Sequence, residues 1–456
     1  MVNWFLFPFN SPHQFTTTKR EDVMKHLALL ASVVFLVLAL TPCAHSAQLN
    51  FTPVLTVSEE YNDNIFLAPD DEEDDFITRV TFGGTLELLG RTAGAELTYL
   101  PSYEWYNDFD DFDGWTHDLL ARTWYNFTAN TSVELRNAFI RTRGSLEDAG
   151  FVGATSDDPL VDPDIAADPY RRGLAEYYEN ATTLRMDHRF GAEDTFYAAF
   201  AYRLRRDVDD GLDENDIWEP SIGGTYWFTN LWGIESDLLY SHRDYESEED
   251  REEWYGRLRL NRRLTRHLDV YGQYVHRNLN YQDDGDDFDV YEPTIGFNYQ
   301  LDENTRIELG VGYYWQEFDS GDSEDGFLPV ALADKVWPFR RGLVGITLLA
   351  GSDIDDEGVE DLGYNIYYEG SARTEYAFTP RFSANARVGY RWDDYPDEDP
   401  GRTDKTIFGS AGLEYQALRW LVLNLDYTFR DLSTDDDLDE YTENRVIFSI
   451  TLTPEQ

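Results

Sequence analysis

The chain has 456 residues, is only 42% hydrophobic and carries a formal net charge of −51 at pH 7. This hydrophobic content is too low for a bundle of membrane-spanning helices, and the negative charge excludes nucleic acid as a partner. The single cysteine, Cys43, lies close to the N-terminus, so neither disulfides nor cysteine-ligated metals are expected in the rest of the chain.

The N-terminal segment has the pattern of a secretory signal peptide. Lys25 and His26 precede an apolar run over 27–40, and small residues follow it over 41–47. The run is shorter than the ~20 residues that a membrane-spanning helix needs. We therefore divide the chain into an upstream extension (1–23), a signal peptide (24–46) and a mature domain (47–456).

Within the mature domain, short tight turns alternate with long acidic, Gly-rich stretches, and the segments between them alternate apolar and polar residues. In 291–301, for example, a row with Ile295 and Phe297 alternates with a row that includes Asn298. This period of two predicts β-strands with one apolar face. About 20 strands are expected, with 18 as the alternative, over 49–60, 76–88, 95–106, 115–128, 131–142, 174–190, 195–206, 217–228, 231–244, 253–264, 267–280, 288–301, 305–317, 327–336, 341–352, 363–378, 381–392, 405–416, 420–430 and 443–453.

The hairpin ends favour a membrane barrel over a water-soluble sandwich. Short turns lie at one end and long acidic loops at the other, and aromatic residues gather near both ends. Trp105, Trp115, Trp218, Trp254, Trp315 and Trp392 lie beside the long loops, while Trp232, Trp420, Phe228 and Phe378 lie beside the short turns. Two aromatic belts match the two interfaces of a bilayer. We predict an all-β fold: a single transmembrane antiparallel up-and-down β-barrel in the cell outer membrane, with short periplasmic turns and long acidic extracellular loops.

Two segments depart from the regular pattern. Pro329 and Pro338 interrupt the alternation over 327–352, which makes these strands the weakest of the set. The longest insert, 142–173, is the candidate for a loop that folds into the lumen and narrows it.

The polar rows predict a charged lumen. Its candidate lining residues are Arg79, Arg122, Arg136, Arg185, Arg257, Arg259, Arg277, Arg373, Arg387, Arg391, Tyr314 and Tyr367. The arginines could form ion pairs that stiffen the wall, or a charged constriction that selects solutes. The tyrosines could stack on sugar rings, or they could fill space.

The acidic loops suggest weak binding of Ca²⁺ or Mg²⁺, and no other cofactor is expected. Asp108, Asp110, Asp111 and Asp113 are dense in carboxylates but lack the spacing of an EF-hand. Solvated loops held near lipopolysaccharide by bridging divalent ions explain this density better than a dedicated site.

Catalysis is not expected. His117, His242 and His276 lie near the outer rim beside acidic residues, but no nucleophile motif and no H-E-x-x-H segment occurs. An outer-membrane rim hydrolase is therefore the weakest of the functional hypotheses.

The start of the mature domain resembles a known family. Residues 53–67, with the stretch Tyr-Asn-Asp-Asn-Ile-Phe over 61–66, and residues 74–78 are similar to the opening of outer-membrane β-barrel porins of the second type. Some members are associated with exopolysaccharide and exosortase (PEP-CTERM) gene systems. The resemblance implies a single barrel and a role in moving or anchoring extracellular polysaccharide. From the residues themselves, a structural role in fixing the first loop is favoured over ligand binding.

The functional prediction is an outer-membrane channel for polar solutes or for the export of extracellular polysaccharide, and not an enzyme. The alternative is a non-conducting structural or docking barrel whose acidic loops bind cations and surface glycans. The expected partners are outer-membrane lipid, lipopolysaccharide and, for an exporter, polysaccharide. The sequence marks no face for a particular oligomer.

Overall fold

The structure, a computed structural model, describes residues 48–143, 176–207, 214–246, 249–282, 287–355, 362–396, 401–435 and 439–454. The predicted extension and signal peptide lie outside these residues, as does nearly all of the 142–173 insert. The described residues form a 20-stranded antiparallel sheet of β1 (Gln48–Asn62), β2 (Asp75–Leu89), β3 (Ala93–Tyr106), β4 (Gly114–Thr128), β5 (Thr131–Thr142), β6 (Tyr177–Arg189), β7 (Thr195–Asp207), β8 (Asn215–Trp227), β9 (Trp232–Tyr245), β10 (Arg251–Arg263), β11 (Leu268–Tyr281), β12 (Phe288–Asp302), β13 (Thr305–Phe318), β14 (Ser323–Phe339), β15 (Gly342–Asp355), β16 (Gly363–Thr379), β17 (Phe382–Tyr395), β18 (Arg402–Leu418), β19 (Leu421–Ser433) and β20 (Tyr441–Leu452).

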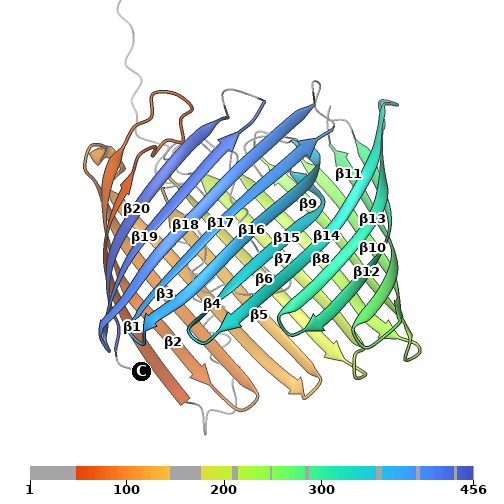
Figure 1. Cartoon of the computed structure of the whole chain (residues 1–456), viewed down its shortest axis with the longest axis horizontal. Coiled ribbons are helices and arrows are strands. Elements are labelled where there is room, and N and C mark those ends of the chain that lie inside the picture. Colours follow the sequence, from red (N-terminus) through yellow and green to blue (C-terminus); the bar gives the residue numbers. More distant parts are fainter. Residues whose placement is uncertain are drawn as a thin grey trace, which may run out of the picture.

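The sheet closes on itself. Each strand pairs with the next in sequence, and β1 pairs with β20 over Leu55–Asn62. Where β1 meets β20, the Thr56 and Thr451 hydroxyls lie 3.0 Å apart, and Asn62 Nδ2 donates to Glu443 Oε1 at 2.7 Å. Figure 1 shows the tilted strands running around the barrel, with the first strand beside the last. The predicted 20-stranded barrel is confirmed, and the 18-stranded alternative is wrong.

Exposed apolar side chains lie on the outward face of the strands. Ile295 and Val388 are among the most exposed, and in a water-soluble sandwich this row would be buried. The aromatic residues expected near the long loops are exposed in the same way, as are Phe228, Phe378 and Trp420 at the other end. Such an apolar band between two aromatic belts fits a bilayer.

The inner wall is built on glycines. Ideal Cβ atoms at Gly296 and Gly310 would come within 2.6 Å of Tyr271, so the ring lies directly against both glycines. Tyr197 lies in the same way against Gly223, and Trp227 against Gly233. The strand pleat places these rings and glycines on the inward rows. Flat rings on glycine cover the inner backbone while occupying little of the lumen.

Arginines stack on these inward rings. The Arg259 guanidinium carbon lies 3.8 Å from the centre of the Tyr271 ring, and Arg185 lies 4.3 Å from that of Tyr197. Such contacts stabilise a cation on an aromatic face. Glycine, aromatic ring and arginine thus form successive layers of the wall.

The upper end of the β15–β16 hairpin leaves the wall. β14 pairs with β15 only from Ala331 and Ala350 downwards, although β14 pairs with β13 up to Ser323. On the other side, β16 pairs with β17 only from Ile366 downwards, although β16 pairs with β15 up to Gly363. Residues 351–355 and 363–365 therefore form a hairpin tip that is bound to neither neighbouring strand.

The tip turns into the barrel. Tyr364 and Ile366 join a buried apolar cluster with Leu279, Phe288, Val290 and Tyr314, which come from the inner face of β11, β12 and β13.

The segment 327–352, where two prolines interrupt the apolar–polar alternation, forms strands as predicted. Strand β14 contains both Pro329 and Pro338. Pro329 lies just above the last pair that joins β14 to β15. Proline suits this place because strand prolines occur at edges.

A glycine pair tests the layered wall. Gly296→Ala places a methyl group 2.5 Å from the Leu309 carbonyl oxygen and against Tyr271, so we expect a loss of about 1–3 kcal/mol in the free energy of unfolding. Gly272→Ala, where nothing lies within 4 Å of the added carbon, should change it little. Urea unfolding followed by tryptophan fluorescence compares the two variants, and equal losses would contradict the layered wall.

Candidate functional site

The predicted lining residues all lie on the row opposite the exposed apolar side chains. They are distributed around the barrel: Arg79 on β2, Arg122 on β4, Arg136 on β5, Arg185 on β6, Arg257 and Arg259 on β10, Arg277 on β11, Tyr314 on β13, Tyr367 and Arg373 on β16, and Arg387 and Arg391 on β17. Alternation along each strand and the cross-strand register put them on the inner face. Their role in solute passage stays a prediction.

Many of these arginines are bound into the wall. Arg79 Nε donates to Glu104 Oε1 at 2.5 Å, and its Nη1 lies 3.8 Å from Glu60 Oε2. Both carboxylates are buried. Arg257 likewise bonds Asp237, with 2.6 Å between Nη2 and Oδ2, and the Tyr197 hydroxyl donates to Asp237 at 2.9 Å. These contacts join neighbouring or near-neighbouring strands, as the ion-pair interpretation of the sequence requires.

One arginine pair is more accessible. Arg373 and Arg387 stand directly opposite each other on β16 and β17, and their side chains are 44% and 54% exposed. Among the described residues, Arg373 pairs with Asp334 at 3.8 Å and Arg387 pairs with Glu369 at 3.7 Å. Like charges directly opposite each other in a sheet are destabilising. A bound anion would relieve this repulsion.

An aromatic ring lies beside the arginine pair. The Arg387 guanidinium carbon is 5.1 Å from the centre of the Phe408 ring, which lies against Gly389. The site therefore combines two cationic groups and an aromatic surface on the inner wall. Recognition of this pair needed the register, since the sequence alone gives no pairing between positions 373 and 387.

The two predicted tyrosines lie on either side of the place where β14 and β15 separate. Tyr314 is buried, lies against Gly326 of β14 and has its ring centre 5.1 Å from that of Tyr364. The Tyr367 hydroxyl lies beside Gly351 of β15, and Arg391 stacks on its ring at 4.8 Å. Both rings are in contact with protein groups, and their role as a stacking surface for sugars stays a prediction.

The inturned tip is held by Glu292 on β12. Its buried carboxylate accepts hydrogen bonds from the Tyr364 hydroxyl at 2.9 Å and from the Ser352 hydroxyl. The predicted lining residue Arg277, on β11, lies 3.9 Å from Asp353 of the tip. This latch narrows the mouth of the barrel. The sequence predicts a constriction in 142–173, and nearly all of that segment lies outside the described residues. The inturned tip is a different candidate for a constriction, which the sequence did not predict.

The first loop also packs inward. Asn64 is fully buried and its side chain bonds the backbone of Ala68 and Thr442. Leu67 then joins an apolar cluster with Leu362, Tyr395, Leu432 and Tyr441 at the loop end of the barrel. The Asn-Asp-Asn stretch over 62–64 thus serves the structure, in agreement with the interpretation favoured from the residues.

No metal centre is found in the described part of the chain, where no three His, Cys, Asp or Glu side chains come together. Asp110 and Asp111 are exposed on a 3₁₀ helix (Asp110–Phe112), and Asp113 Oδ1 accepts from the Tyr106 backbone N–H. Asp108 is also exposed. Weak binding of Ca²⁺ or Mg²⁺ at these residues stays a prediction. Across the described residues, helices long and apolar enough for a bilayer span are absent.

The rim histidines lie on separate strands. His117, His242 and His276 belong to β4, β9 and β11 and lie on the outward rows. His117 Nδ1 lies 2.9 Å from the Tyr99 hydroxyl, and His242 and His276 lie 3.6 Å and 3.4 Å from Glu252 and Asp289. The three side chains do not form a common site.

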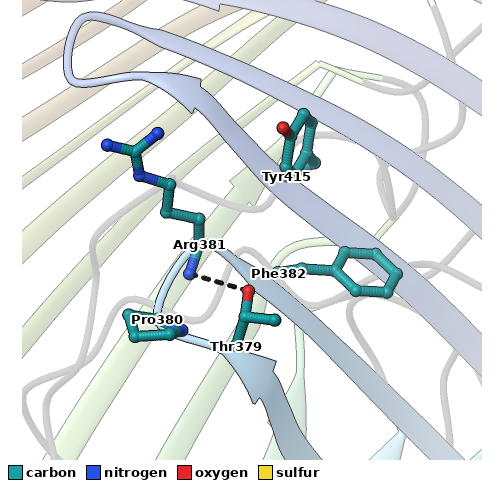
Figure 2. Close-up of a pocket in the computed structure, with 5 residues that line it drawn as sticks. All are labelled: Thr379, Pro380, Arg381, Phe382 and Tyr415. Atoms are coloured by element: carbon teal, nitrogen blue, oxygen red, sulfur yellow. Dashed lines mark hydrogen bonds between the residues drawn. The ribbon is translucent and has the colours of Figure 1, made fainter.

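A pocket lies at the turn between β16 and β17. It is lined by Thr379, Pro380, Arg381, Phe382 and Tyr415. Figure 2 shows the Arg381 backbone nitrogen donating to Thr379 Oγ1 while its guanidinium points away from the Phe382 ring. Phe382 and Tyr415 are paired on the outward rows, so this pocket lies at the membrane interface and is no part of the lumen.

Taken together, the closed sheet, the apolar outer band and the polar inner wall define an outer-membrane β-barrel protein. Residues 246–453 match the family described as "Putative beta-barrel porin 2". The family resemblance noted at residues 53–78 is thereby confirmed on a different part of the chain, and the outer membrane is confirmed as its location. No curated protein sequence matches the chain.

Solved structures share the barrel. The FrpB iron transporter from Neisseria meningitidis is 10% identical, with a TM-score of 0.52 over 89% of this chain and 82% of that one. The siderophore receptor PirA from Acinetobacter baumannii is 8% identical (TM-score 0.49, 89% and 80%), and OccK2 (OpdF) from Pseudomonas aeruginosa is 12% identical (TM-score 0.42, 89% and 99%). At these identities the likeness to FrpB shows the fold alone.

Two arginines distinguish wall-forming from accessible charges. Arg79→Gln leaves the buried Glu60 and Glu104 without their partner, so we expect a loss of about 3–5 kcal/mol in the free energy of unfolding. Arg122→Gln removes a pair with Glu134 in which the arginine side chain is 49% exposed, and its loss should stay within about 1 kcal/mol. Urea titration of both variants measures the difference, and similar losses would show that burial does not govern these pairs.

Proposed function

We propose that the protein is an outer-membrane channel for polar solutes and that acidic extracellular polysaccharide is its cargo. The observation that carries the channel is the inner wall, where charged and polar side chains follow the strands through the apolar band. Water-filled lumens need such a lining, whereas a solid barrel core is filled by side chains. The family match supports the same class of function.

The arginine pair on β16 and β17 supports the choice of an acidic cargo. Arg373 and Arg387 are exposed, face each other and have no carboxylate closer than 3.7 Å among the ion pairs of the described residues. A uronate carboxylate can accept from both guanidinium groups, and the adjacent Phe408 ring offers an apolar surface for a sugar. A neutral sugar would gain only the second contact.

Planar-bilayer conductance of the purified protein tests the channel. Discrete, ion-conducting steps are expected, and addition of oligogalacturonate should lower the current more than addition of neutral maltooligosaccharide. A sealed barrel would contradict the channel and would favour the docking barrel instead.

Substitution of the arginine pair tests the cargo. Arg373→Gln with Arg387→Gln should weaken the block by oligogalacturonate by roughly tenfold or more, because each charge-assisted hydrogen bond contributes about 1.5–3 kcal/mol. The matched control is Arg306→Gln, which removes a similarly exposed inward arginine 3.7 Å from Glu308. If Arg306→Gln has the same effect, the lumen charge as a whole, and not this pair, governs the block.

The latch should limit conductance. Tyr364→Phe combined with Ser352→Ala removes both hydrogen bonds to Glu292, so the tip should spend more time away from the wall and the single-channel conductance should rise. Tyr313→Phe is the control because the Tyr313 hydroxyl bonds Asp325 on the outward side of β13 and β14. A rise in both variants, or in neither, would contradict a latch at Glu292.

A further inference from the structure

The place where β14 and β15 separate is a gap in the hydrogen bonding of the wall, here called the seam. It is bounded by residues 323–330 of β14 and by residues 351–355 of β15, and pairing resumes at Ala331 and Ala350. In hydrocarbon, an open sheet edge is not tolerated, because lipid offers no partner for backbone N–H and C=O groups. The backbone groups of the seam must therefore be covered by other parts of the protein, by water from the lumen or by a bound molecule.

The seam reaches the lipid-facing surface. Trp315 of the outer aromatic belt is paired with Asp325 of β14, and Phe327, the next outward residue on β14, is 59% exposed. Phe327 and Pro329 belong to the unpaired stretch. The edge of β14 thus lies against the outer leaflet just below the interface.

Four inward residues beside the seam are apolar. Leu332 is paired with Glu308 on β13, an inward residue that bonds Arg259, and with Leu349 on β15. Leu332 and Leu349 therefore face inward, and the alternation places Val330 and Leu328 on the same row. We call Leu328, Val330, Leu332 and Leu349 the inner apolar patch.

The surroundings of the inner apolar patch are those of a site for an amphiphile. The patch is continuous with the glycines at 310 and 312 on β13. Below it the inward residues are polar: the Thr347 hydroxyl donates to Asp334 at 2.9 Å, and Arg373 lies 3.8 Å from the same carboxylate. Three of the four patch residues are only half-buried, so apolar surface remains open towards the lumen. In a water-filled channel this exposure is unfavourable unless an apolar group covers it.

We propose that the seam is a lateral opening through which an acyl chain of an outer-leaflet lipid enters the barrel wall and binds the inner apolar patch. Lipid is the occupant because the seam is continuous with the lipid-facing surface. A water-soluble ligand would instead bind the polar parts of the inner wall. The chain would cover the inner apolar patch, the polar headgroup would stay at the interface, and water from the lumen would hydrate the unpaired backbone groups of β14. This inference does not depend on the proposed cargo or on conductance.

Photolabelling tests the proposal. The protein is reconstituted in vesicles of phosphatidylethanolamine and phosphatidylglycerol that contain a phospholipid with a diazirine on one acyl chain, and labelled residues are mapped by mass spectrometry. A two-chain phospholipid stays in the bilayer, so it reaches an inward residue only through the wall. We expect labelling of Leu332 and Leu349 besides the outward Leu348, and none at Leu239, a half-buried inward leucine on β9.

Variants complete the test. Leu332→Asn and Leu349→Asn should each lower labelling of the patch about tenfold, which corresponds to about 1.4 kcal/mol of lost binding. Leu239→Asn should leave it unchanged, and labelling of Leu348 serves as the internal reference. Heat-modifiable electrophoretic mobility shows which variants are folded. If wild-type protein labels Leu332 and Leu349 no more than Leu239, the proposal is wrong whatever the variants do.

Discussion

The structure depends on one constraint, which is that backbone hydrogen bonds inside a membrane must be made within the protein. Lipid offers no donors or acceptors, so a sheet in hydrocarbon has to close. The pairing of β1 with β20 meets this requirement, and side-chain contacts at Thr56 and Asn62 reinforce it. The outward rows can then be apolar throughout, and the polar rows are left to line the interior.

The inner wall reconciles many charges with stability. Arginines whose carboxylate partners are buried, such as Arg79, hold adjacent strands together. Others stack on rings that lie flat against glycine, as Arg259 does on Tyr271. Both arrangements hold the charged groups against the wall. Arg373 and Arg387 face each other directly and are more exposed than Arg79, and each also lies within 4 Å of a carboxylate.

At the loop end, one hairpin loses its pairing with both neighbouring strands. The β15–β16 tip leaves both neighbours and is bound to Glu292. The inward turn of the hairpin therefore places the tip on the inner face of the wall and leaves the upper part of β14 without its pairing to β15. A barrel with no function beyond forming a closed wall would not need this loss of pairing between β14 and β15, since continuous pairing would satisfy more backbone groups. The latch and the seam are two consequences of the same bend, which links passage along the axis to access from the side.

The sequence by itself determined the barrel, a strand number of about 20 with 18 left open, the aromatic belts and the inward row of arginines and tyrosines. These follow from local alternation, since a period of two assigns each residue to one face whatever its distant neighbours are. Pro329 identified the strand whose pairing is irregular in the structure. A proline in the sequence does not show by itself whether a strand is interrupted or continues as an unpaired edge. Only the tertiary structure decided which arginines oppose each other, that Tyr314 is buried under Tyr364, and that the tip turns inward. Those features depend on register and on contacts between residues far apart in the chain, and no local pattern encodes them.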